Sequence, residues 1–395
     1  DGTYTYTPDA GFTGSDSFTY TVDDGQGGSD TATVEIMVNA VVSGPNLAFG
    51  DVASNGGWQT VTLPSSYNSM VVVASPNYDK SDVPAVVRIR NANGNSFEFA
   101  VQQATNSSSP TFVSGVAVHY TVMEEGTYNN PTDGYKLEVV KYNSSVTDEN
   151  NSWVGQSRSY QQAYANPVVV GQVMSFNDSD WSVFWAAGGS RTSAPSSGAL
   201  TVGKHVGEDF DVTRSNETIG YFVIEATTSA TINGLPIAAG VTNDFVRGTE
   251  NVSSANGYQY DYDISFNSKA AVVSNAGMDG ADGGWAVLYG NDPVSPFSSL
   301  INVAIDEDQI ANTERKHTTE QVAYFVVDPP IVEDGAELSE VVASSSLNEI
   351  PADLRFFAVT GDDRSEATKD PAQITLRRTS SDANAELSLA GVNTA

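Results

Sequence analysis

The chain has 395 residues and is strongly acidic, with 18 Lys and Arg against 49 Asp and Glu and a formal net charge of −31. Basic residues this sparse exclude broad contact with nucleic-acid phosphates and disfavour docking on anionic membranes. No apolar run is long enough to insert across a bilayer, and the absence of cysteine excludes disulfides and thiolate metal sites. The 39% of hydrophobic residues can form the cores of roughly two to four domains.

The first forty residues form a section of their own. Aromatic residues and threonine alternate in residues 3–7 and again in 17–22, which is the period of a half-buried strand. Residues 23–28 predict a turn, and 31–38 predict a closing strand. The run DGTYTYTP, followed by DSFTYTVDDGQGG, resembles the second half of the cadherin-like, Ig-fold tandem repeats of bacterial surface adhesins. Such a module needs roughly twice this length to close a sandwich.

From about residue 41 a different repeat begins. One marker is an apolar strand that ends in an acidic residue, and it occurs at 118–124, 219–225 and 322–328. A second marker precedes it, at 67–73, 164–170 and 266–273. Both recur with a period of about one hundred residues and stay in step, so the repeat is not a coincidence of composition.

Further short strands lie between these markers, at residues 86–91, 181–185 and 285–289, and each is followed by turn residues. Since no stretch has convincing helical periodicity, we predict an all-β protein of tandem antiparallel β-sandwich domains. The predicted parts are a cadherin-like fragment (1–40), β-sandwich repeats at 41–140, 141–228 and 229–332, and a partial fourth repeat (333–395).

The sequence pattern at each end of the chain predicts half of a domain. One interpretation is that the sequence is a section of a longer protein. The other is that each half is completed by a neighbouring chain through strand exchange, because an unpaired half-sandwich would expose a sheet edge and an apolar face.

The first repeat carries four further stretches of note: WQTV from Trp58, VRIRNA from Val87, SFEF from Ser96 and HYTV from His119. Together they resemble the H-type lectin domain over residues 46–126, with weaker likeness in the two later repeats. The resemblance implies a six-stranded antiparallel β-sandwich of about this size that often assembles as trimers on sugar ligands. The sugar contacts of that family do not map onto matching positions here.

Acidic loops follow the valine-rich strand of each repeat. They contain the pairs Asp79 and Asp82, Asp178 and Asp180, Asp279 and Asp282, and Asp362 and Asp363. Carboxylates at this spacing can surround a hard cation, which predicts Ca²⁺ sites, although Asp and Gly also form turns without any ion. A further acidic cluster, Asp23 and Asp24, is a second candidate for Ca²⁺.

Two of the five tryptophans, Trp58 and Trp153, lie in polar segments and are candidates for stacking on a sugar ring, whereas Trp181, Trp185 and Trp285 are predicted in the core. The three histidines occupy different positions in their repeats, so no shared metal site is expected. The repeat-equivalent Glu124, Glu225 and Asp328 predict strand-end caps. No catalytic sequence motif occurs, so we expect no enzyme activity.

The favoured function is an extracellular structural or adhesive one: a segment of a large bacterial surface adhesin or a subunit of a filament, at the cell surface or secreted. Its expected partners are copies of itself or adjoining modules of a longer chain, together with surface glycans. The alternative is a carbohydrate-binding, lectin-like module.

Overall fold

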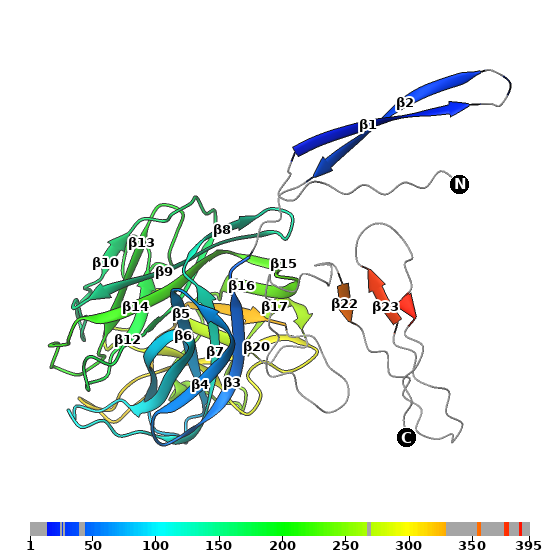
Figure 1. The fold of residues 1–395 in the computed structure, drawn as a ribbon. Coiled ribbons are helices and arrows are strands. Elements are labelled where there is room, and N and C mark those ends of the chain that lie inside the picture. Colours follow the sequence, from blue (N-terminus) through cyan, green and yellow to red (C-terminus); the bar gives the residue numbers. More distant parts are fainter. Residues whose placement is uncertain are drawn as a thin grey trace, which may run out of the picture. The chain divides into compact units, whose positions relative to one another are not determined.

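The computed structural model describes residues 14–23, 26, 28–38, 44–266 and 270–328, and the short antiparallel strands β22 (Leu354–Phe356), β23 (Thr375–Arg378) and β24 (Leu387–Ser388) (Figure 1). The chain divides into two units, residues 1–43 and 44–395. The predicted all-β class is confirmed: the described part consists of strands and one turn of 3-10 helix, η1 (Thr249–Asn251).

The described part of the first unit is a β-hairpin. β1 (Gly14–Asp23) pairs antiparallel with β2 (Ser29–Val38), and Phe18 lies opposite Val34. These two side chains are half-buried, while the threonines between them face outward. The two strands of the hairpin match the prediction for residues 17–22 and 31–38, but Tyr20, on the same face as Phe18, is exposed, and the strand predicted at residues 3–7 lies outside the described residues.

The second unit begins with the first sandwich. Its strands are β3 (Leu47–Asn55), β4 (Gln59–Tyr67), β5 (Met70–Tyr78), β6 (Ala85–Gln103) and β7 (Ser114–Glu124). β7 lies between β3 and β5 in one sheet, and β4 pairs with the second half of β6 in another. β6 contains the left-handed residues Asn91 and Gly94 between its halves, so it supplies two of the six strands of the sandwich.

The second sandwich repeats this plan. One sheet has the order β11-β14-β9-β8 and the other β10-β13-β12. The strands are β8 (Gly126–Asn130), β9 (Tyr135–Ser144), β10 (Gln156–Arg158), β11 (Pro167–Val173), β12 (Val183–Ala187), β13 (Leu200–His205) and β14 (Glu217–Glu225). The sequence-based boundary at residue 140 falls within β9, and the sheets instead place the break near Glu125.

The third sandwich has the sheets β15-β16-β21-β18 and β17-β20-β19. Its strands are β15 (Thr227–Ile232), β16 (Leu235–Val241), β17 (Tyr258–Phe266), β18 (Ala270–Asn275), β19 (Trp285–Tyr289), β20 (Ser298–Asp306) and β21 (Val322–Val327). The β15–β16 hairpin turns through Asn233-Gly234, both in the left-handed region, which is the favoured sequence for such a tight turn.

The three sandwiches close into a ring. The valine-rich strands β5, β11 and β18, one from each repeat, pack against one another. The strand that follows each of them lies beside the valine-rich strand of the next repeat: Gln172 Nε2 donates to Val87 O, Ala186 bridges Ala276 in parallel, and β19 pairs parallel with the end of β5. Repeat 1 thus contacts repeat 2, repeat 2 contacts repeat 3, and repeat 3 returns to repeat 1. We call this arrangement the three-repeat ring.

One apolar core extends through all three repeats of the ring. It joins Val72, Phe222 and Phe325, none of which is measurably exposed, and the two phenylalanine rings from repeats 2 and 3 lie 6.4 Å apart. Burying a side chain of this size contributes about 1.5–3 kcal/mol. Because each repeat buries part of its inner surface against its neighbours, the ring is the folding unit of residues 44–328.

Candidate functional site

The acidic residues at the strand ends close loops, as predicted for two of the three. Glu124 accepts hydrogen bonds from the backbone N–H groups of Asn68 and Ser69, at 2.9 and 2.6 Å. Glu225 does the same for Ala165 and Asn166, at 2.8 and 2.6 Å. The corresponding loop of the third repeat, at residues 267–269, lies outside the described residues.

Replacing Glu124 with alanine removes both acceptors and is expected to lower the free energy of unfolding by about 1–2 kcal/mol. Glu124→Gln retains one acceptor oxygen and is expected to cost less than the alanine variant. Chemical denaturation of the full chain measures both, and equal stability of Glu124→Ala and the parent would contradict the cap.

The acidic loop of the first repeat, residues 79–82, is a local turn. The Asp79 carboxylate accepts from the backbone N–H of Ser81 at 2.7 Å and also from its hydroxyl, and the Asp82 carboxylate accepts from Asp79 N at 2.9 Å. The hydrogen bonds of Ser81 hold the pKa of Asp79 below its ordinary value. The two carboxylates are therefore engaged with backbone and hydroxyl donors of their own loop.

The backbone carbonyls of the acidic loops receive arginine side chains from the neighbouring repeat. Arg315 of repeat 3 donates to the carbonyls of Lys80 and Asp82, at 3.2 and 2.6 Å. Arg88 of repeat 1 donates to those of Asp178 and Asp180, at 2.9 and 3.0 Å. 

The third junction has the same feature, since Arg191 of repeat 2 donates to Asp279 O at 3.3 Å. A guanidinium group thus binds each of the three described acidic loops, and in each case it comes from the preceding repeat around the ring. In the structure, these loops join one repeat to the next.

The backbone N–H groups of two of these loops bind a buried glutamate of their own repeat. Glu217 accepts from Asn177 N and Asp178 N, at 3.1 and 2.9 Å, and Glu320 accepts from Asp279 N and Gly280 N. Each of these loops is therefore held by an acid of its own repeat on one side and an arginine of the neighbour on the other.

The Ca²⁺ prediction stays a prediction. Within residues 14–328 as far as they are described, no group of three or more His, Cys, Asp or Glu side chains converges to hold a metal ion. Asp24, Asp362 and Asp363 lie outside the described residues, and Asp23 ends β1 with a side chain that is not described.

A buried histidine lies at the junction of repeats 2 and 3. His317 Nδ1 is 2.6 Å from Glu307 Oε1, and its Nε2 is 2.8 Å from Glu320 Oε1. Burial by itself lowers the pKa of His317, but the hydrogen bonds and charges of the two carboxylates outweigh it and raise that pKa to about 9. His205, also buried, has its pKa lowered to about 3 by burial and stays neutral.

The tryptophans predicted in the core are buried, and the two candidates for sugar stacking differ from each other. Trp58 is half-buried, with the Arg90 guanidinium 4.0 Å from its ring centre and the Phe176 ring at 4.9 Å. Trp153 is 39% exposed and packs loosely on Trp185, at 6.3 Å. The indole of Trp153 is therefore more accessible to a ligand than that of Trp58, because the Arg90 guanidinium covers the face of the Trp58 ring.

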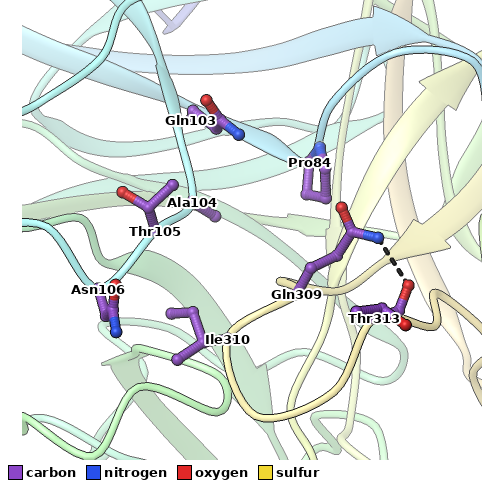
Figure 2. Close-up of a pocket in the computed structure, with 8 residues that line it drawn as sticks. All are labelled: Pro84, Gln103, Ala104, Thr105, Asn106, Gln309, Ile310 and Thr313. Atoms are coloured by element: carbon purple, nitrogen blue, oxygen red, sulfur yellow. Dashed lines mark hydrogen bonds between the residues drawn. The ribbon is translucent and has the colours of Figure 1, made fainter.

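An open pocket of about 390 Å³ lies between repeats 1 and 3, and no sequence motif pointed to it (Figure 2). Repeat 1 contributes Pro84 and residues 103–106, and repeat 3 contributes Gln309, Ile310 and Thr313. Figure 2 shows residues 103–106 on one side of the opening and Gln309 and Thr313 on the other, with Pro84 on the side of Gln309 and Ile310 near Asn106. The lining combines carboxamides and hydroxyls with the apolar Pro84, Ala104 and Ile310, and it includes no charged side chain.

The repeat 3 side of the pocket is fixed by buried acids. Asp308 accepts from Ile310 N and from Glu208 N, at 2.9 and 2.8 Å. Glu208, from repeat 2, in turn accepts from the backbone of Ala311 and the carboxamide of Asn312. Burial raises the pKa of Asp308 to about 7, against the lowering effect of its hydrogen bonds. Repeats 2 and 3 therefore shape this loop together.

Comparison with known proteins locates one family. A family model described as a bacterial Ig domain matches residues 1–37, which is consistent with the resemblance seen in the first forty residues. No curated protein and no solved structure matches the chain. Residues 1–37 are thus similar to a bacterial Ig domain, and this similarity suggests a surface or extracellular protein. Among the described residues, no helix has the length and apolar character needed to cross a membrane.

Proposed function

We propose that this protein is an extracellular adhesive protein of a bacterial surface, in which the three-repeat ring is the part that binds. The observation that carries the proposal is the bacterial Ig domain at residues 1–37. The ring supports it because a single core fixes three sandwiches relative to one another, which suits a rigid head. On this proposal the protein acts by binding and not by catalysis.

A second candidate, a carbohydrate-binding module, is favoured by the ring itself. The likeness to the H-type lectin domain implied six-stranded sandwiches that often assemble as trimers. The chain has three sandwiches, one of six strands and two of seven, joined covalently and closed into a ring. Agreement between the sequence resemblance and this arrangement is the support for a lectin-like function.

A filament subunit is the structural variant of the first proposal. Two measurements on the purified full chain separate the candidates. The first presents fluorescent beads coated with the chain to an array of glycans, with and without free sugar as competitor. The second measures mass by light scattering over a hundredfold concentration range, together with electron microscopy.

Saturable bead attachment that free sugar prevents would support adhesion through carbohydrate. Concentration-dependent fibres without attachment would support the filament subunit. A chain that stays monomeric and attaches to no glycan would contradict both forms of the proposal.

A further inference from the structure

We propose that the pocket between repeats 1 and 3 binds one neutral saccharide residue per chain. The inference rests on the proposed function as a binding protein, and it assigns the ligand class and the location. It starts from the pocket's volume of about 390 Å³, which lies within the range of small-molecule sites.

The chemistry of the lining selects a neutral, hydroxyl-rich ligand. Gln103, Asn106 and Gln309 each present a carboxamide, a group that both donates and accepts, as sugar hydroxyls require. Pro84 and Ile310 supply apolar surface for the C–H groups of a sugar ring. A chain with a net charge of −31 places no charged side chain in this lining, so a carboxylated or ammonium-bearing ligand would gain no ion pair there.

The lining is also held in place before any ligand arrives. Gln309 Nε2 donates to Thr313 O at 2.6 Å, which fixes the carboxamide and leaves its oxygen as an acceptor (Figure 2). On the other side, Ala104 N donates to Pro84 O at 2.9 Å. A preformed site lowers the entropy that a ligand loses on binding.

At the other two junctions, the loops of the two repeats are joined by direct hydrogen bonds. Between repeats 2 and 3, Glu208 binds the backbone of Ala311 and the carboxamide of Asn312. Between repeats 1 and 2, Trp181 Nε1 donates to Thr105 O at 3.0 Å. The ring is therefore unequal at its three junctions, which is the reason to expect a stoichiometry of one.

The test uses the full chain and a panel of methyl glycosides of neutral hexoses and N-acetylhexosamines, with galacturonic and sialic acids as charged counterparts. Saturation-transfer NMR reports binding, and titration calorimetry of the best ligand gives affinity and stoichiometry. We expect binding of at least one neutral glycoside at a ratio of one, and none of the acids. Asn106→Trp, which places an indole across the mouth, is expected to weaken binding about tenfold or more.

Matched variants separate a local effect from misfolding. Ser108→Trp changes an equally exposed residue of the same loop outside the pocket, and it is expected to bind as the parent does. Gln309→Ala removes the fixed carboxamide and is expected to weaken binding roughly two- to tenfold. Circular dichroism and melting temperature confirm that each variant is folded.

Three results would overturn the inference: no glycoside of the panel binds, binding is the same in Asn106→Trp and the parent, or the acids bind as well as the neutral sugars. Each leaves the adhesive function open, because bead attachment can use another surface. Bead attachment lost in Asn106→Trp and kept in Ser108→Trp would support both.

Discussion

Arg315→Ala is expected to lower the free energy of unfolding of the ring by about 3–5 kcal/mol. Arg315 binds both carboxylate oxygens of Asp306, at 2.7 and 2.8 Å, and spans the junction to the carbonyls of Lys80 and Asp82. Asp306 has no exposed surface, so the variant leaves a buried negative charge supported only by hydroxyl donors such as Tyr78 and Thr249. Chemical denaturation of the full chain measures the loss.

A double variant tests the cause. Arg315→Met with Asp306→Leu removes both charges, and we expect it to be more stable than Arg315→Ala, because most of the cost comes from the unpaired carboxylate. Arg90→Ala is the control for arginine as such: its ion pair with Glu98 is 36% and 26% exposed and is expected to contribute about 1 kcal/mol or less. An Arg315→Ala variant as stable as Arg90→Ala would refute the role of Arg315 in closing the ring.

The strands and the repeat could be predicted because both follow from local sequence patterns. The Tyr-containing strands β7, β14 and β21 and the valine-rich β5, β11 and β18 follow their markers closely. The boundaries between the repeats were harder to predict from the sequence. β8 pairs with β9, and β15 pairs with β16, at the start of the two later sandwiches. The sheet of repeat 1 has no described strand in this position, so the repeat pattern did not predict β8 and β15.

The ring could not be predicted, since the residues that close it have no common position. Arg88 lies in β6, Arg191 in the loop after β12, and Arg315 in the loop after β20. A repeat search finds residues that recur, and these three do not. The acidic loops did recur, and the sequence therefore pointed to the loops as sites without revealing that their carbonyls accept arginine.

The pocket could not be predicted from the sequence either. Its two sides, residues 103–106 and 309–313, are about two hundred positions apart and consist of ordinary loop residues. No motif marks them, because their relation exists only once repeat 3 has closed against repeat 1. A functional site built across a ring junction becomes visible from the fold and not from the spacing of residues.

As the pH rises from 6.5 to 9.5, the contribution of His317 to the stability of the ring is expected to fall by about 3 kcal/mol. The pKa of His317 is raised from 6.5 to about 9, so its stabilising effect is complete below pH 6.5 and is lost as the pH rises through about 9. The partner Glu307, whose pKa burial raises to about 7, adds to the same trend, because its ionisation in the folded state is disfavoured. Denaturation with urea at a series of pH values gives the slope.

His317→Gln should flatten this slope while lowering stability at pH 6.5, because glutamine can donate to one carboxylate but carries no charge to balance Glu307 and Glu320. His205→Gln is the matched control: His205 is buried and neutral over the whole range, so its replacement changes stability without changing the slope above pH 6.5. The other acids near the cluster, Asp279, Asp282 and Glu314, remain in both variants. A slope as steep in His317→Gln as in the parent would show that the histidine is uncharged between its two carboxylates.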